Sequence, residues 1–78
     1  MTDLEILNAL TEMDKTVVVR YAENMMRMTR TAKELYMAHS GIYYHLISIK
    51  AKTGLDPKNF YDLVHLVKLI QREREANG

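Results

Sequence analysis

Three basic side chains recur at every third position over one short stretch of the chain. Arg27, Arg30 and Lys33 have a spacing that places side chains near one another on a helix surface. Guanidinium and ammonium groups held together in this way are the groups with which proteins contact phosphates. Glu34 lies beside them, and an ordinary solvated helix face is the alternative interpretation. The first candidate chemistry is therefore phosphate contact.

The three histidines do not have the spacing of a metal site. Two ligands on one helix need to lie three or four residues apart, whereas His39 and His45 are separated by six positions and a predicted turn, and His65 is remote. The chain has no Cys, which excludes thiol nucleophiles and Cys-based zinc sites. Paired carboxylates, a Ser-His-Asp arrangement and a Gly-rich phosphate loop are also missing from the sequence. We therefore expect no enzyme, no metal and no other cofactor.

Length and composition predict one small helical domain over residues 1–78. Hydrophobic residues make up 47% and charged residues 27%, which is a globular balance, and 3 Gly with 1 Pro leave few sharp turns. The 11 Lys and Arg nearly balance the 10 Asp and Glu, so the net charge of +1 does not by itself indicate a polyanionic partner. No apolar run approaches the roughly 20 residues of a membrane span, and no signal-peptide layout is present. We expect an all-α cytoplasmic protein with no membrane partner.

Capping signals and helical periodicity predict two helices in the first third of the chain. Thr2 and Glu5 have the layout of a capping box, which predicts a first helix over about Asp3–Met13. Asp14 is a candidate N-cap for a second helix, Asp14–Met26. Val17–Val19 taken alone would indicate a strand, but the apolar spacing after it is helical and no partner strand exists elsewhere.

The rest of the chain predicts three further helices. Thr29 is a candidate N-cap for a short helix to Tyr36, and Ser40 for a longer one over Ser40–Thr53. Gly54 lies where a left-handed C-terminal cap is expected. A last helix follows Asn59, and a charged tail follows at 72–78. The expected buried stripe of the last helix is Phe60, Leu63, Val64, Val67 and Ile70.

Two leucines of the last helix lie outside that stripe and need cover. Leu66 and Leu69 could be covered by the first helix of the same chain, through Leu4, Leu7 and Leu10, or by a second subunit. The sequence leaves both alternatives open.

The predicted helices over 29–53 form a helix-turn-helix candidate. Ala32 is small and lies where two steeply crossing helices must approach closely, and Leu35, Ile42 and Leu46 would fix their relative angle through burial. Periodicity alone does not distinguish this unit from any other pair of antiparallel helices.

Particular residues of this stretch also match a family pattern. They are Thr31 and Ala32, Leu35 and Tyr36, Tyr44, Leu46 and Ile49, the Thr53-Gly54-Leu55-Asp56 turn, and Phe60 with Asp62. The region over Val17–Gln71 resembles the C-terminal DNA-binding domain of the PucR-type regulators, the purine catabolism and carbohydrate diacid regulators of bacteria. The resemblance implies a Fis-like helix-turn-helix fold and sequence-directed binding to duplex DNA.

The chain departs from the family at the reading helix. The family commonly has His-Arg-Asn-Thr where this chain has Ala38 to Gly41, and family arginines correspond here to Tyr43, His45 and Ile47. Family members usually carry a large sensor region as well. The sequence therefore indicates a stand-alone regulator of the kind that phages and mobile elements carry.

The resemblance implies a role for each side of the unit. The helix at about 40–53 would enter the major groove, with the protein acting as a homodimer on a two-fold operator. Base edges would be contacted by Ser40, Tyr43, Tyr44, Ile47 and Ser48, through hydroxyls and through apolar contact with thymine methyls. Phosphates would be contacted by Arg27, Arg30, Lys33, His39 and Lys50.

The loss of the family arginines supports a second interpretation. The surface around Ile47 and Ala51 could equally serve as a protein contact. The alternative function is a protein-interaction module, an anti-repressor or an inhibitor of a host factor, that keeps the fold but does not bind DNA.

Overall fold

The protein is all-α. The computed structural model describes residues 1–77, and Gly78 lies outside the described part. Within these residues there is no strand, and the five helices are α1 (Asp3–Ala9), α2 (Glu12–Glu23), α3 (Met28–Glu34), α4 (His39–Thr53) and α5 (Phe60–Asn77). The segment Val17–Val19 is part of α2, as helical periodicity predicts. No helix in the described chain combines the length and apolarity needed to cross a membrane.

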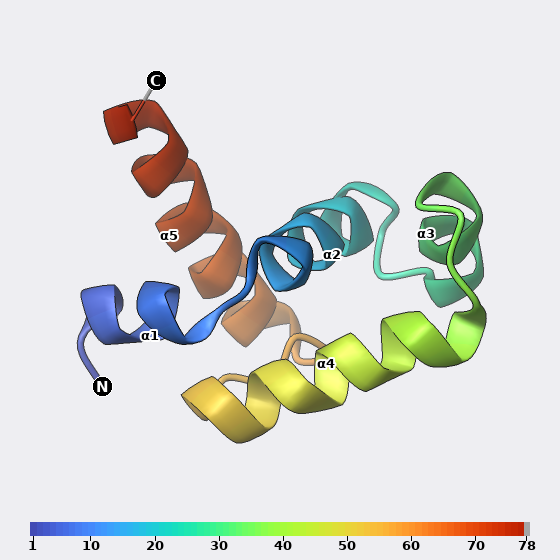
Figure 1. The fold of residues 1–78 in the computed structure, drawn as a ribbon, viewed down its shortest axis with the longest axis horizontal. Helices are drawn as coiled ribbons and strands as arrows, with labels where there is room; N and C mark the ends of the chain where they lie inside the picture. The colour runs from blue at the N-terminus through green and yellow to red at the C-terminus, as the bar shows by residue number, and fades with distance from the viewer. Residues whose placement is uncertain (78) are drawn as a thin grey trace.

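Helix α2 is the centre of the packing. It contacts α3, α4 and α5, while α1 packs across α4 and α5 on one side of the molecule (Figure 1). The α4 residues that face α2 are fully buried, and they meet α2 and α5 side chains in a single core. The largest fully buried apolar side chains are Val17, Val18, Ile42, Leu46, Ile49, Leu66 and Ile70. One face of α4 therefore packs into the core.

The boundary between α1 and α2 differs from the prediction. Helix α1 begins with the predicted Thr2–Glu5 capping box but ends at Ala9 rather than Met13. Thr11, not Asp14, is the N-cap of α2: its hydroxyl accepts from the Asp14 amide at 3.0 Å, and the Asp14 carboxylate accepts from the Thr11 amide at 3.0 Å. Asp14 is thus the third residue of a second capping box, and the predicted cap is wrong by three positions.

Helix α2 ends before the predicted Met26. The Met26 amide donates to the Tyr21 carbonyl at 2.8 Å and the Met25 amide to the Ala22 carbonyl at 3.1 Å, which are the two hydrogen bonds of a Schellman motif. Met25 and Met26 have φ of 55° and 62°. The expected extension of the helix is therefore wrong, because the chain turns into the left-handed region there without a glycine.

Helix α3 begins and ends earlier than predicted. It starts at Met28 with Arg27 as N-cap and no side-chain capping bond, so Thr29 is not the cap. It ends at Glu34 in another Schellman motif, in which Met37 donates to Ala32 at 2.9 Å and Tyr36 has φ 54°. Ala32 is buried against α4, as predicted.

Helix α4 begins one residue before the predicted Ser40. Ala38 is its N-cap and provides no side-chain bond, so Ser40 is not the cap and lies exposed in the first turn. At the other end Gly54 is a left-handed C-cap with φ 77°, as predicted. The sector formed by Ile42, Leu46, Ile49 and Thr53 is buried as expected.

Helix α5 buries Leu63 and Ile70 of the predicted stripe and half-buries Val64 and Val67. Asn59 caps it by accepting from the Asp62 amide at 3.1 Å. Phe60 is 59% exposed, so its assignment to the core is wrong. Leu66 and Leu69 are buried within the single chain, where α1 packs on α5, so a second subunit is not needed to cover them.

The charged segment after Gln71 is helical through Asn77 rather than a frayed tail. Lys15 of α2 binds Glu73 of α5 with 2.7 Å between Nζ and Oε1. The hydrogen bond that Lys15 donates to Glu73 raises the pKa of Lys15, against the opposing effect of burial. This ion pair holds the end of α5 against α2.

Candidate nucleic-acid interface

Four of the five predicted phosphate-contacting residues surround one hollow at the junction of α3 and α4. Arg27, Arg30, Lys33 and His39 line it together with Met28 and Thr29, and its volume is about 660 Å³. We refer to this feature as the basic hollow. Thr29, which the sequence indicated only as a helix cap, also lines the hollow and lies in the first turn of α3. The hollow lies at the N-terminal end of α4, where free helix amides also favour anions.

Positive charge is concentrated on this part of the chain. Residues 27–53 contain five Lys or Arg against a single acidic residue, Glu34, which leaves +4, while the remaining residues contain six against nine and carry −3. Among residues 1–77, Arg27, Arg30 and Lys33 form no ion pair, whereas Glu34 pairs with Arg20 of α2 at 3.2 Å. The near-neutral total therefore conceals a strongly polarised molecule.

The fifth predicted phosphate residue stands apart from the basic hollow. Lys50 lies in the last turns of α4, about 16 Å along the helix axis from His39 at 1.5 Å per residue. Its Nζ is 3.6 Å from Asp56 Oδ2, yet 58% of its side chain is exposed. Cationic groups therefore lie at both ends of α4.

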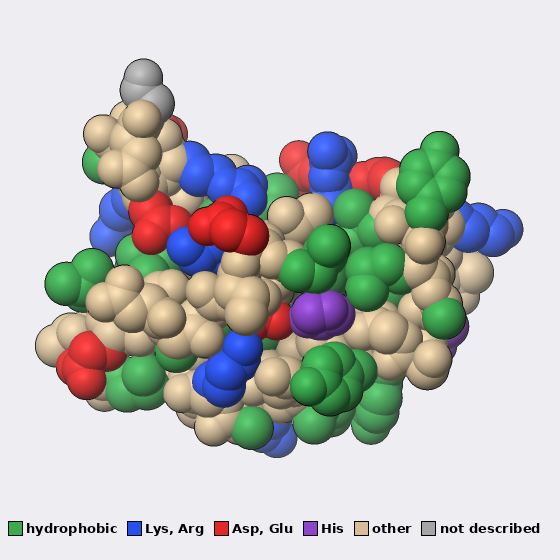
Figure 2. All heavy atoms as spheres, viewed as in Figure 1, with side chains coloured by type: hydrophobic (Ala, Val, Ile, Leu, Met, Phe, Trp, Pro, Cys, Tyr) green, Lys and Arg blue, Asp and Glu red, His purple; other side chains and the backbone are tan. Residues whose placement is uncertain are grey.

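The predicted base-contacting residues lie on the side of α4 that faces away from the core. Tyr44 is 68% exposed, Tyr43 48% and Ile47 42%, and Ser40 and Ala51 are exposed beside them. Ser48 is half-buried. Figure 2 shows hydrophobic side chains along the lower edge of the molecule, where Figure 1 places α4. We refer to Ser40, Tyr43, Tyr44, Ile47, Ser48 and Ala51 as the outer face of α4.

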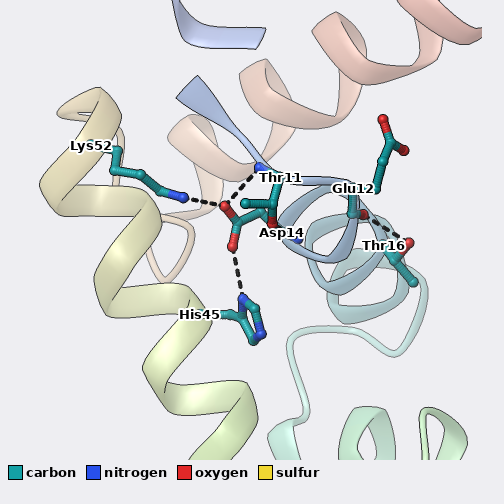
Figure 3. A network of polar contacts seen from close by, with 6 residues as sticks. All are labelled: Thr11, Glu12, Asp14, Thr16, His45 and Lys52. Atoms are coloured by element: carbon teal, nitrogen blue, oxygen red, sulfur yellow. Dashed lines mark hydrogen bonds and ion pairs between the residues drawn. The ribbon is translucent and has the colours of Figure 1, made fainter. Parts of the chain in front are cut away.

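The polar residues at the border of this face are held by a buried carboxylate of α2 (Figure 3). Asp14 is 1% exposed, and its Oδ1 lies 2.7 Å from His45 Nδ1, while its Oδ2 accepts from Lys52 Nζ and from the Thr11 amide. An ionised carboxylate only accepts hydrogen bonds, so the shared proton lies on Nδ1 of the imidazole. His45 and Lys52 therefore join α4 to α2.

The surroundings of Asp14 stabilise its charged form. Burial raises the pKa of the Asp14 carboxyl, but hydrogen bonds from Lys52, the Thr11 amide and His45 outweigh burial and leave the pKa below its ordinary value. A charged group can be buried without a large cost in free energy only when it is paired and hydrogen-bonded, and the three donors around Asp14 meet this condition. We refer to Asp14, His45 and Lys52 as the Asp14 cluster.

Two tyrosines of the outer face are supported by neighbouring side chains. The Tyr44 ring packs edge-on against the His45 ring, with 5.7 Å between centroids and 78° between planes. The Lys58 ammonium lies 5.1 Å from the centroid of the Tyr43 ring, in cation–π geometry. Because Asp14 holds His45, the position of Tyr44 depends indirectly on a residue of α2.

Sequence patterns predicted most of the exposed residues of the outer face of α4 but not these supports. The PucR-type resemblance implies an arginine at the position of His45 and a contact with DNA, whereas the His45 side chain turns inward to Asp14. Lys58 follows α4 in a loop and has no periodic relation to Tyr43. A long-range partner of opposite charge, such as Asp14, leaves no local signal in the sequence.

No group of three or more His, Asp or Glu side chains in the described chain could hold a metal ion.

A second hollow is apolar. It has a volume of about 530 Å³ between the end of α2 and the outer side of α5, and Met25, Met26, Phe60, Val64 and Val67 contribute its walls. We refer to it as the apolar groove. It explains why Phe60 is exposed: the residue lies on the rim of a surface that the chain itself leaves open.

Comparisons of the chain with protein-family models, with curated proteins and with solved structures found no match.

Proposed function

We propose that the protein is a small bacterial or phage transcriptional regulator that binds duplex DNA through α3 and α4, with α4 in the major groove. The observation that carries the proposal is the basic hollow at the start of an exposed, uncharged helix face. Phosphate contacts position a protein on DNA, and the groups that read base edges lie beside them. The PucR-type resemblance supports the same role and a Fis-like fold. DNA binding in a bacterium would place the protein in the cytoplasm.

The dimensions of α4 agree with this proposal. The major groove is about 12 Å wide, and the cations at the two ends of α4 are about 16 Å apart along the helix. Arg27, Arg30, Lys33 and His39 would contact one strand and Lys50 the other. The outer face between these ends would then lie opposite the base edges.

The proposed regulator acts as a homodimer. Leu66 and Leu69 do not support this, because they are already buried within the single chain, but the apolar groove is a surface on which a second copy would pack. Two copies double the number of phosphate contacts and match a two-fold operator. Light scattering should show a dimer for the native chain and a monomer for Val64→Glu.

The proposal is tested by titrating a mixed-sequence duplex at several salt concentrations. Each neutralised phosphate contributes about 0.9 to the slope of log affinity against log salt, so the four Lys and Arg contacts per copy predict a slope of about 3–4 for one copy and about 7 for the dimer. Arg30→Ala should weaken binding and lower the slope by about 1 per copy. Tyr44→Ala should weaken binding with no change in the slope.

Arg72→Ala is the matched control, because it removes one exposed Arg of α5 that lies far along the chain from the basic hollow. It should leave both affinity and slope unchanged. Thermal melting of all variants checks that the fold is retained. A slope that implies ten or so contacts per copy, or equal losses for Arg30→Ala and Arg72→Ala, would contradict the proposed interface.

The protein-interaction module is the second candidate. The observation that favours it is the exposure of Tyr44 and Ile47 on a face without charged residues. An anti-repressor or an inhibitor of a host factor would use this face for an apolar contact. If neither Tyr44→Ala nor Arg30→Ala alters retention on any DNA while melting is unchanged, this candidate is favoured.

A further inference from the structure

We infer that the outer face of α4 recognises thymine methyl groups, so that the preferred site is rich in A·T pairs where Ile47 and Ala51 lie. This inference rests on the proposed function and specifies the sequence that the same site would select. Its physical basis is that apolar side chains of the outer face of α4 are exposed, whereas the cationic side chains of α4 that could read guanine are few.

Few side chains of α4 remain free to read guanine. The commonest specific contact in the major groove is Arg or Lys to guanine O6 and N7. Within α4 the only cationic residues besides histidine are Lys50 and Lys52. Lys52 Nζ donates to the buried Asp14, and Lys50 Nζ lies 3.6 Å from Asp56. No arginine is available on this helix, and its second lysine is committed to the Asp14 cluster.

The structure leaves apolar groups free in their place. Tyr44, Ile47 and Ala51 follow one another at three- and four-residue steps along the outer face. Ile47 is 42% exposed, and no other part of the described chain covers it further. The C5 methyl of thymine is the one apolar group that a base pair presents in the major groove, and aliphatic side chains contact it. Ile47 is therefore matched to an A·T pair.

The polar groups of the same face do not restore a preference for guanine. Ser40 and Ser48 carry hydroxyls, which donate and accept equally and accommodate either kind of pair. The Tyr44 hydroxyl is similar, but its ring is positioned by His45 and so presents a defined apolar edge beside Ile47. The methyl contact is the discriminating interaction that remains.

The inference is tested by selecting bound duplexes from a random pool and then replacing thymine with deoxyuracil in the enriched site. Deoxyuracil lacks only the C5 methyl, so base pairing is unchanged. Burying one methyl group is worth about fourfold in affinity. We expect an A·T-rich site and a loss of about fourfold for each thymine that contacts Ile47.

Ile47→Ala supplies the second half of the test. The variant should bind the thymine and deoxyuracil duplexes equally, because the side chain that senses the methyl is gone. Leu4→Ala is the matched control: it trims another exposed aliphatic side chain, which lies on α1, and should keep the full discrimination. The deoxyuracil comparison on the native protein does not depend on any variant folding.

The outcomes separate the two proposals. A pool with no enriched site would overturn the proposed function. An enriched G·C-rich site, or an A·T-rich site that tolerates deoxyuracil at every position, would overturn methyl recognition while leaving DNA binding in place. Retained discrimination in Ile47→Ala would assign the contact to another side chain and overturn the role of Ile47.

Discussion

The two sides of α4 use similar residue types for opposite purposes. On the side that faces α2, Leu46 is fully buried, and His45 and Lys52 are bound to Asp14. On the outer face, Ile47 and Tyr44 are exposed. The role of a side chain on this helix therefore depends on whether it contacts α2 or solvent. Only the side chains of the outer face remain free to contact a ligand.

The sharpest way to test this comparison is to trim neighbouring aliphatic residues on the two sides. Leu46→Ala should lower the free energy of unfolding by about 3 kcal/mol, because it leaves a cavity in the core. Ile47→Ala should lower it by less than about 1 kcal/mol, since its side chain is already half in solvent. Urea denaturation of the two variants measures both values. Equal losses would contradict the assignment of the two faces.

The second test removes the carboxylate of the Asp14 cluster. Asp14→Ala should lower the free energy of unfolding by about 2–3 kcal/mol, because His45 and Lys52 lose their partner and α2 loses part of its capping box. The matched control is Glu12→Ala in the same turn of α2. Its side chain is 85% exposed and pairs only with Lys15 at 3.5 Å, so its loss should stay within about 0.5 kcal/mol. Urea denaturation of both variants decides whether Asp14 has the larger effect.

The third test uses pH in place of mutation. Because the pKa of Asp14 is lower in the folded protein than in the unfolded chain, the carboxylate stabilises the fold fully above the unfolded value of about 3.9. That stabilisation is lost as the pH falls through the folded pKa. The difference in unfolding free energy between the native chain and Asp14→Asn should therefore shrink below about pH 4.

Denaturation curves measured between neutral and acidic pH check this prediction. Taking the difference between the two proteins removes the contribution of other carboxylates. One of these is Glu5, because hydrogen bonds with Thr2 lower its pKa. A difference that is constant across the acidic range would show that Asp14 is not ionised against α4.

The smallest predicted effect lies in the turn that leads into α4. Tyr36 has φ 54° and is 98% exposed, so its side chain makes almost no packing contact to offset the cost of the left-handed backbone. Tyr36→Gly should raise the free energy of unfolding by about 0.5–1 kcal/mol. A shift in the thermal midpoint measures it, and Tyr36→Ala, which keeps a Cβ, should not give the same gain.

The sequence predicts elements well where the signal is local. The Gly54 cap, the Thr2 capping box and the buried sector around Ile42 follow from neighbouring residues, and all three are confirmed. The sequence predicts the wrong N-cap for α2 because Thr11 and Asp14 are both favourable N-cap residues. Their reciprocal hydrogen bonds in the structure identify Thr11 as the cap. Local chemistry leaves that choice open.

Features that depend on distant residues could not be predicted. Phe60 has the spacing of a core residue, but no helix packs over it, and it borders the apolar groove instead. No sequence pattern indicates a partner for His45, and its partner Asp14 lies 31 positions earlier in the chain. The gathering of Arg27 and His39 around one hollow depends on the turn between α3 and α4. Periodicity describes one helix and carries no information on what packs against it.

The most direct test of the central claim is to map backbone amide chemical shifts of the labelled protein while a duplex is added. We expect the largest changes at Arg30, His39, Tyr44, Ile47 and Ser48, with little change along α1 and the outer side of α5. Changes centred on the apolar groove, or no changes at any duplex concentration, would contradict the claim that the outer face of α4 binds DNA.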